Sequence, residues 1–378
     1  MKVMCIMNQN ILNVKSGGGQ CSKRNYDAIK ESLEEGDVLY ICMISPEFAE
    51  CCQKEKELWI PGLRGNIQSA VAAMQGCKCC TKANEKKIWK YIDAIRPEII
   101  YLDTSKLGHM AKKLKKKYGS KILVFFHNVE SDYSQNLIKN RGKQYLLSYW
   151  ASLGNEKKAV RYADKMICLT EKDSNRINEL YGRRPDEIIP ISFADSYDES
   201  RCTIRRENGL LFIGSLFPPN YDGIKWFVEE IMDKIPEQML TIVGKDFEKK
   251  TELERENVKV VGTVEHLEDY YYAYPVIVMP ILYGAGMKVK TAEAMMYGKV
   301  ILATDEALEG YNVSEADGVY KCNTQEEFIA AIRRVFCEPI DFKNSKIRIK
   351  FLTFYEYRVI QKQFEKLIKS LGKRYGAM

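Results

Sequence analysis

Residues 276–311, VIVMPILYGAGMKVKTAEAMMYGKVILATDEALEGY, decide the fold of this chain. The nearly continuous apolar run Val276–Ile281 predicts a parallel strand that is covered on both faces. A loop of small residues follows, and a helix is expected from about Met287 until Gly298 ends it. The apolar run Val300–Ala303 predicts a second buried strand. A strand, a loop, a helix and a strand in this order are typical of a doubly wound α/β domain.

The loop before the predicted helix has the chemistry of a phosphate site. Gly284 and Gly286 let the backbone come close to a ligand, and the helix start presents unpaired amides and the positive end of the helix dipole. Lys290 and Glu293 are three residues apart, so they share one helix face. The lysine suits a diphosphate, and the glutamate can accept hydrogen bonds from a ribose diol. The stretch predicts a nucleotide site; the alternative is a solvated ion pair beside an ordinary turn.

The stretch GAGMKVKTAEAMMYGKVILAT, with the EGY that follows it, resembles the donor site of family-four retaining glycosyltransferases of the GT-B fold, the glycosyl transferases group 1. The resemblance implies that Lys290 contacts the donor diphosphate and that Glu293 holds the nucleotide ribose. Many of these enzymes carry a further glutamate that contacts the donor sugar, where this chain has Ala285. The sugar is then left to the amides of the loop from Gly284 to Met287, a feature shared by a branch of the family with a G-x-G loop.

Three further positions resemble donor contacts of the family. After the first strand, Gly17, Gly18 and Gly19 are similar to a glycine loop that packs against the donor phosphates, and a flexible surface loop is the alternative. Ser215 follows a strand glycine at a position where several relatives have an arginine on the diphosphate. Lys245, at another strand end, is a secondary phosphate candidate. Phosphate binding should therefore depend more heavily on the main loop and its lysine.

His127 follows the strongly apolar strand Lys121–Phe126, at the strand end where open α/β sheets bind ligands. The chain has only three histidines, and a satisfied structural histidine is the alternative interpretation. In the resembling family a strand that ends in H-N-x-E faces the donor sugar, and its histidine helps to position or polarise the reacting sugar and acceptor. His127 and Lys290 are therefore the candidate catalytic residues.

Composition limits the class of protein. A chain of 378 residues fits two domains, and 46% hydrophobic with 29% charged residues is typical of a globular protein. The net charge of +7 is mild, and no nucleic-acid module appears, so we expect no nucleic-acid partner. Prolines and glycines break the longest uncharged run, Tyr270–Met287, so we expect no membrane span. The apolar part of the N-terminal MKVMCIMNQN is too short for a secretory signal, and we expect a first strand there. Twelve cysteines without secretion indicate a cytoplasmic protein.

The alternation of strands and helices predicts two Rossmann-like, doubly wound α/β domains facing a cleft. We expect an N-terminal acceptor-side domain over residues 1–197 and a donor domain over 198–345. A polar stretch, Asp195–Asn208, is the expected linker. The segment 346–378 contains one amphipathic helix, Phe351–Leu371, that should return to the first domain.

The sequence contains two clusters of like side chains, one of cysteines and one of lysines, and each has two possible interpretations. The region Ser45–Thr81 has little periodicity and in the family shapes the acceptor pocket. It holds closely spaced cysteines, at 51, 52, 77, 79 and 80, whose adjacent spacing favours free thiols over a metal site. A dense basic cluster, lysines 112, 113, 115, 116 and 117, is either a solvated helix face or a contact with anionic lipid headgroups.

These observations predict a retaining glycosyltransferase. It would move a sugar from a nucleotide-diphosphate donor to a glycan or lipid-linked acceptor in surface polysaccharide or glycoconjugate synthesis, in the cytoplasm and at the inner face of the plasma membrane. We expect no metal or cofactor besides the donor substrate, because Lys290, the loop amides and the helix dipole can stabilise the leaving diphosphate. One alternative is a catalytically silent GT-B subunit that supports a partner transferase, based on Ala285 and the missing arginine. A GT-B sugar-nucleotide epimerase is another, although the first domain shows no matching set of acid and base residues.

Overall fold

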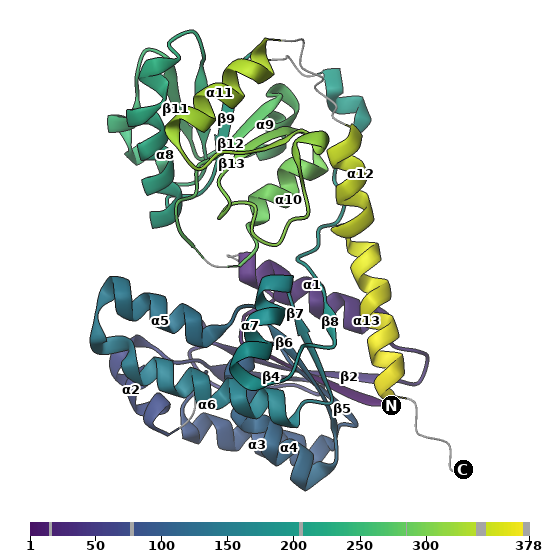
Figure 1. Ribbon diagram of the computed structural model, residues 1–378. Coiled ribbons are helices and arrows are strands. Elements are labelled where there is room, and N and C mark those ends of the chain that lie inside the picture. The colour runs from purple at the N-terminus through teal and green to yellow at the C-terminus, as the bar shows by residue number, and fades with distance from the viewer. Residues whose placement is uncertain (15–16, 76–78, 204–206, 285, 338–344, 373–378) are drawn as a thin grey trace. The chain divides into compact units, whose positions relative to one another are not determined.

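The structure is a computed structural model that describes residues 1–14, 17–75, 79–203, 207–284, 286–337 and 345–372. It consists of two compact units, shown in Figure 1. The first unit combines residues 1–190 with 358–378, and the second unit is continuous from Ile191 to Tyr357. The units therefore divide after residues 190 and 357, where the sequence places the boundaries after 197 and 345.

The first unit is built on an eight-stranded sheet with the order β3-β4-β2-β1-β5-β6-β7-β8. All neighbours in it are parallel except β3 and β4. Its strands are β1 (Lys2–Met7), β2 (Val38–Ser45), β3 (Cys52–Gln53), β4 (Glu57–Pro61), β5 (Ile99–Leu102), β6 (Lys121–Phe126), β7 (Lys165–Cys168) and β8 (Glu187–Ile188). Because parallel strands are covered on both faces, β1, β5 and β6 are almost wholly apolar.

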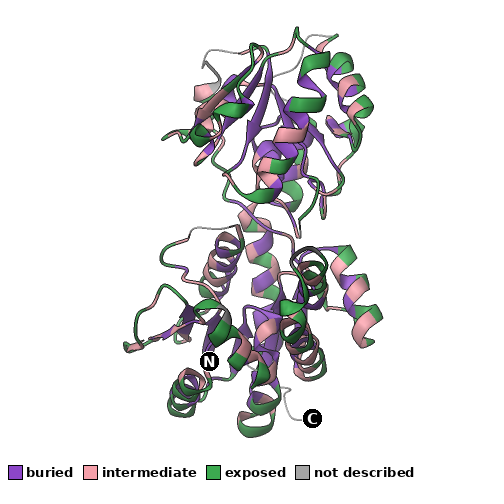
Figure 2. Cartoon of the chain, turned by 90° about the vertical axis from the view of Figure 1, so that its left-hand side faces the viewer, coloured by how far each residue is buried: buried purple, intermediate pink, exposed green. Residues whose placement is uncertain are grey.

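Helices cover both faces of this sheet. They are α1 (Gly17–Glu31), α2 (Gly65–Met74), α3 (Lys82–Ile95), α4 (Gly108–Tyr118), α5 (Glu130–Arg141), α6 (Leu146–Tyr162), α7 (Glu171–Tyr181) and α13 (Tyr357–Gly372). Along β5, Ile100 and Leu102 join the core beneath α3, α4 and α6, whereas Tyr101 contacts Asn25 of α1 and Phe364 of α13 on the opposite face. Figure 2 shows the strands as the buried interior and the outer helix faces as exposed.

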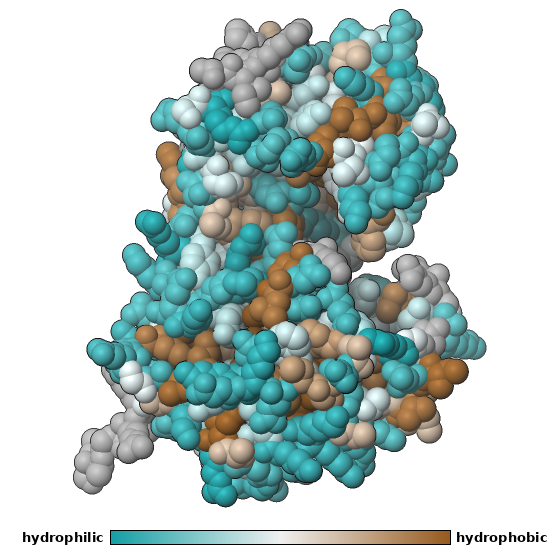
Figure 3. Space-filling view, turned by 180° about the vertical axis from the view of Figure 1, so that it is seen from behind, coloured by the Kyte–Doolittle hydropathy of each residue, from teal (hydrophilic) through white to brown (hydrophobic). Residues whose placement is uncertain are grey.

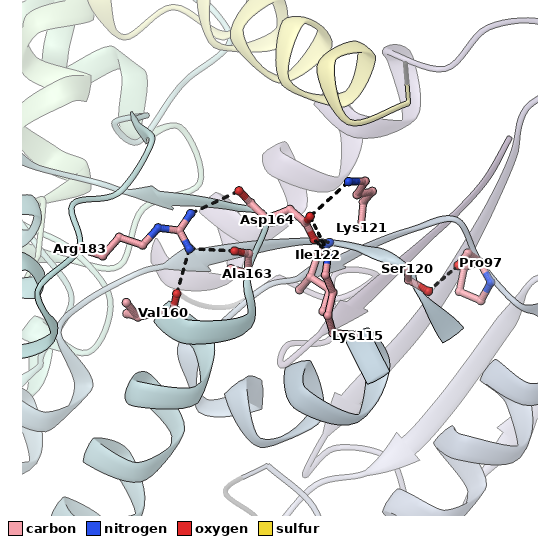
Figure 4. A network of polar contacts seen from close by, with 9 residues as sticks. All are labelled: Pro97, Lys115, Ser120, Lys121, Ile122, Val160, Ala163, Asp164 and Arg183. Atoms are coloured by element: carbon pink, nitrogen blue, oxygen red, sulfur yellow. Dashed lines mark hydrogen bonds and ion pairs between the residues drawn. The ribbon is translucent and has the colours of Figure 1, made fainter. Parts of the chain in front are cut away.

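A polar network secures the edge of the first sheet where β6 and β7 begin (Figure 4). The Asp164 carboxylate accepts a hydrogen bond from the Ile122 amide at 2.9 Å and pairs with Lys115 Nζ at 2.6 Å. Arg183 donates to the carbonyls of Val160 and Ala163 at 2.9 and 2.8 Å, satisfying the end of α6. This edge is opposite to the carboxyl ends of the strands, so Lys115 has a structural role.

The second unit contains a six-stranded parallel sheet with the order β11-β10-β9-β12-β13-β14. Its strands are β9 (Leu210–Ile213), β10 (Leu240–Val243), β11 (Val258–Gly262), β12 (Val276–Met279), β13 (Val300–Ala303) and β14 (Val319–Lys321). Its helices are α8 (Pro218–Glu230), α9 (Leu267–Ala273), α10 (Val289–Met296), α11 (Gln325–Phe336) and α12 (Ser345–Phe354). Phe227 of α8 and Phe328 of α11 meet edge to face, with ring centroids 5.3 Å apart, and join the core on one face of the sheet. Helices α9 and α10 lie on the other face (Figure 1).

Two expected segments are divided differently in the structure. The expected single helix Phe351–Leu371 is wrong: α12 ends at Phe354, and α13 begins at Tyr357. Between them the backbone forms a parallel bridge with Phe193, whose amide donates to the Tyr355 carbonyl at 2.9 Å. The aperiodic region Ser45–Thr81 contains β3, β4 and α2, of which β4 continues the parallel sheet beside β2.

Candidate functional site

The loop after β12 is held by Lys288. Its ammonium donates to the Gly286 carbonyl at 2.6 Å and pairs with Glu306 Oε1 at 2.7 Å. Gly286 has a φ of +67°, a left-handed conformation that favours glycine. Gly284 is exposed, Met287 is buried, and Ala285 lies outside the described residues. The lysine therefore links the loop to Glu306, which follows β13.

Lys290 and Glu293 lie on one face of α10 and contact each other. Lys290 Nζ is 2.7 Å from Glu293 Oε2, and both side chains are half-buried. The Tyr271 hydroxyl of α9 donates to the same carboxylate oxygen at 3.2 Å. Tyr271 is buried and stacks on Tyr297, with ring centroids 4.6 Å apart. Tyr271 thus fixes the position of the Glu293 carboxylate. The sequence did not predict this contact, because Tyr271 belongs to α9, which precedes the motif.

The start of α10 is not capped by the side chain of its N-cap residue. Its N-cap residue, Lys288, makes no side-chain cap hydrogen bond, so the first amides lack the usual side-chain acceptor. The Lys288 carbonyl accepts from the Tyr311 hydroxyl at 2.7 Å, so the tyrosine of the EGY motif anchors the helix start. A phosphate is a suitable partner for such amides.

Ser215 and Lys245 follow two neighbouring strands of the same sheet. Both residues are exposed, and the Leu216 amide donates to the Lys245 carbonyl at 2.8 Å. Because β9 lies between β10 and β12, these residues and the loop after β12 share one edge of the sheet. A Cβ on Gly244 would lie 1.7 Å from the Gly214 carbonyl oxygen, so the two backbones approach as closely as glycine allows. The three strand ends form one candidate phosphate surface.

The three glycines after β1 do not form the expected loop. Gly17, Gly18 and Gly19 are the first turn of α1, so the expected loop conformation is wrong, whereas their contact with the donor phosphates stays a prediction. The buried face of α1 includes Gly19, Ser22 and Asn25. Because these residues are spaced three apart, as on one helix face, the helical pattern already includes the glycines. A Cβ on Gly18 would meet nothing within 4 Å.

In the first unit, His127 belongs to a buried polar network at the carboxyl ends of β5 and β6. His127 Nε2 lies 3.4 Å from Asp103 Oδ1, and Ser22 Oγ donates to Asp103 Oδ2 at 2.7 Å. The Tyr101 hydroxyl donates to Asp103 Oδ1 at 3.1 Å. Burial opposes the charge of the histidine, but the Asp103 carboxylate outweighs this and raises the pKa of His127 to about 10. His127 is therefore an imidazolium at neutral pH.

Sequence reasoning identified His127 but missed Asp103. The two residues are 24 positions apart and meet because β5 and β6 are adjacent and parallel. A signal was present, since each strand is followed closely by a polar residue at its carboxyl end.

A cavity of about 550 Å³ opens beside this edge of the first sheet. Its lining includes Asn8, Lys106 and Glu130, which follow β1, β5 and β6. Lys106 Nζ is 3.1 Å from Glu130 Oε1, and the attraction of Glu130 raises the pKa of Lys106 despite burial. The remaining wall comes largely from α2, α5 and α6 and includes Ile67 and Leu147. The cavity combines a charged pair with apolar walls.

The buried Glu156 of α6 holds the helix that begins at Glu130. Its carboxylate accepts from the Glu130 amide at 2.6 Å and from the Tyr181 hydroxyl at 2.6 Å. Because α5 has no side-chain cap of its own, Glu156 supplies this cap from another helix.

The basic cluster of α4 is partly engaged in structural contacts. Lys113 Nζ lies 3.9 Å from the centre of the Trp89 ring, and Lys117 pairs with Asp93. Together with the pairing of Lys115 in Figure 4, these contacts reduce the free charge of the cluster.

Cys51 and Cys52 are half-buried free thiols, Cys79 and Cys80 are buried, and Cys77 lies outside the described residues. In the described part of the chain, no group of three or more His, Cys, Asp or Glu side chains is arranged to hold a metal ion. Across these same ranges no helix has the length and apolar character needed to cross a bilayer.

Comparison with known proteins links the second unit to a family of glycosyl transferases. Residues 207–338 match the family model described as glycosyl transferases group 1. A protein of Klebsiella pneumoniae, described as an uncharacterized 44.6 kDa protein in the cps region, is 22% identical over 279 residues, which are 66% of this chain and 67% of that protein.

Solved structures with the same fold span nearly the whole chain. Sucrose-phosphate synthase from Thermosynechococcus elongatus has a TM-score of 0.74 at 15% identity, covering 98% of this chain and 99% of its own. Anabaena HepE in complex with UDP has a TM-score of 0.68 at 13% identity, covering 98% and 100%. The lipopolysaccharide outer core galactosyltransferase WaaB has a TM-score of 0.65 at 15% identity, covering 98% and 99%. The fold is that of GT-B glycosyltransferases, and the family match supports the group 1 superfamily.

Proposed function

We propose that this chain is a retaining glycosyltransferase that moves a sugar from a nucleotide-diphosphate donor to a glycan or lipid-linked acceptor. The observation that carries the proposal is the Lys290–Glu293 pair at the start of α10, within the segment that matches the family. The solved structures of HepE with UDP and with UDP-glucose support a donor of this chemical class. The relative named for the cps region supports a role in polysaccharide or glycoconjugate synthesis.

The donor diphosphate would be held at the loop after β12. Lys290 and the uncapped amides of α10 would stabilise the charge that develops on the leaving diphosphate, an electrostatic contribution that is usually large in such reactions. Glu293, fixed by Tyr271, would accept hydrogen bonds from the ribose. Ser215 and Lys245 would supply further phosphate contacts from the neighbouring strand ends. This arrangement invokes no metal and no cofactor.

In the first unit, His127 would act on the reacting sugar or acceptor as a hydrogen-bond donor. An imidazolium held by Asp103 can donate but cannot accept a proton, so we assign it no role as general base. In a front-face reaction the leaving phosphate itself takes the proton of the acceptor hydroxyl. The cavity with Lys106 and Glu130 is the candidate acceptor pocket.

The sequence features that favour a silent GT-B subunit are Ala285 and Ser215, where many relatives have glutamate and arginine. Hydrolysis and transfer assays with a panel of UDP, GDP and ADP sugars distinguish the two functions. Turnover with any donor, abolished by Lys290→Ala, supports the enzyme. Binding of a nucleotide without turnover of any donor contradicts it and favours the silent subunit.

A further inference from the structure

Exposed apolar side chains gather on three helices of the first unit. They are Ile67, Val71 and Met74 on α2, Tyr133 on α5, and Leu146, Leu147 and Trp150 on α6. Helix α6 packs against both α2 and α5, and Ile67, Tyr133 and Leu147 line the same cavity, so we treat these side chains as one surface, here called the apolar face. Figure 3 views the molecule from behind, and brown side chains gather at its right-hand edge, the side on which α2 lies when Figure 1 is turned. Clustered exposure of this kind usually marks an interaction site.

Helix α2 turns its apolar stripe outward. Ile67, Val71 and Met74 are spaced i, i+4 and i+7 and therefore lie on one helix face. A surface helix normally buries such a stripe, yet these side chains are 83%, 50% and 75% exposed. The helix, GNIQSAVAAM, has no charged residue. At the start of α6, Leu146 and Trp150 are spaced i and i+4 and extend the same surface, with Trp150 65% exposed.

The segments that carry α2 and the start of α6 have no acidic residue. The sequence contains no Asp or Glu from Leu58 to Asn84, which includes α2, and none from Tyr133 to Asn155, which includes the start of α6. Exposed Lys139 and Lys143 lie in the second of these stretches, and Lys143 precedes Leu146 by less than one helical turn. The acidic residues at the start of α5, Glu130 and Asp132, pair with Lys106 and Arg176. An apolar surface flanked on its α5–α6 side by lysines that pair with no acidic residue in the described part of the chain is complementary to an anionic lipid interface.

We propose that α2 and the first turns of α6 dock this protein on an anionic phospholipid bilayer. Ile67, Met74 and Trp150 would enter the boundary between headgroups and acyl chains, while Lys139 and Lys143 meet lipid phosphates. An indole suits this depth because one part of it is apolar and its N–H can donate to water or a headgroup. This surface is separate from the lysine cluster of α4, whose side chains are partly engaged in ion pairs.

The docking surface adjoins the candidate acceptor pocket, because Ile67 and Leu147 belong to both. If the proposed transfer occurs, a lipid-linked acceptor could present its sugar to the pocket while its lipid stays in the bilayer; only this consequence rests on the proposed function. The docking itself is measured without donor or turnover. Loss of docking and loss of activity are therefore separate results.

The test is co-sedimentation of the full chain with vesicles of phosphatidylcholine alone and with vesicles that also contain phosphatidylglycerol. We expect binding to the anionic vesicles, and a loss on the order of tenfold or more in the variant Ile67→Gln with Met74→Gln. The matched control is Ile349→Gln in the second unit, whose side chain is 60% exposed, and it should bind like the wild type. Lys143→Glu should weaken binding through charge alone. A blue shift of Trp fluorescence on binding, absent in Trp150→Phe, would locate the contact.

Several results would overturn the proposal: no vesicle binding by the wild type, equal binding to neutral vesicles, or equal binding by the double variant. Light scattering tests whether the apolar face instead binds a second copy of the chain. If the wild type is a dimer that the double variant separates into monomers, and vesicles are not bound, the face joins two copies of the chain and the bilayer proposal is wrong.

Discussion

Replacement of Lys290 by alanine tests the proposed donor site most directly. The ammonium lies 2.7 Å from Glu293 Oε2, and the lysine side chain is 34% exposed, so it can reach a ligand without a change of fold. A charge-assisted hydrogen bond to a phosphate contributes about 1.5–3 kcal/mol. Its loss should raise the Kd of the preferred nucleoside diphosphate about 10- to 150-fold.

The same substitution should leave the fold almost unchanged. A partly exposed ion pair at this helical spacing contributes only about 0.2–0.5 kcal/mol to stability. Lys225→Ala is the matched control, because Lys225 pairs with Glu229 at 3.7 Å on the surface of α8 in the same unit and is 43% exposed. Both variants should therefore unfold at temperatures close to that of the wild type.

Isothermal titration calorimetry with UDP, GDP and ADP, followed by thermal unfolding of each variant, measures both quantities. We expect weak binding only for Lys290→Ala and wild-type binding for Lys225→Ala. If the two variants bind the nucleotide equally well, the lysine does not hold the diphosphate and the reasoning is refuted. If Lys290→Ala lowers the unfolding temperature substantially, its affinity does not report on the site.

Three further outcomes follow from the geometry. Asp103 raises the pKa of His127 to about 10, so the stability from this pair should be complete below the ordinary histidine pKa of about 6.5 and be lost as the pH rises through 10. The unfolding temperature should therefore fall less over this pH range in Asp103→Asn than in the wild type. An equal fall of the unfolding temperature in both proteins would contradict the pairing. Phe364→Ala removes a fully buried ring of α13 and should lower the free energy of unfolding, measured with denaturant, by about 3–5 kcal/mol. Phe354 is 48% exposed, so Phe354→Ala should change it little. Similar losses in the two variants would contradict the packing of α13. Gly18→Ala should keep or raise the unfolding temperature, because its Cβ meets nothing within 4 Å in a helix, and a decrease would contradict the helical first turn of α1.

The sequence predicted what depends on neighbours along the chain. The strand Val300–Ala303 has the predicted bounds, because a short apolar run between Gly298 and Thr304 has few alternatives. Lys290 and Glu293 could be placed on one helix face from the sequence, because helical spacing alone brings the two side chains together.

Contacts that depend on tertiary structure were not predicted, although the polar residue after each strand was a signal for Asp103. Asp103 reaches His127 only because two strands are neighbours in the sheet, and Tyr271 reaches Glu293 from another helix. Helix α2 was missed because its apolar stripe points outward and no charged residues mark its other face. The three glycines were read as a loop by composition, whereas the buried face of α1 extends through them.

The discontinuity of the first unit determines the order in which this protein can be completed during synthesis. Its core includes Ile360, Phe364 and Ile368 of α13, which leave the ribosome only after the whole second unit has been made. A fragment that stops near residue 190 would expose the surface against which these side chains pack, while residues 191–357 form a continuous segment. A nascent chain should therefore fold its middle portion first and depend on chaperones to protect its beginning until the last helix arrives.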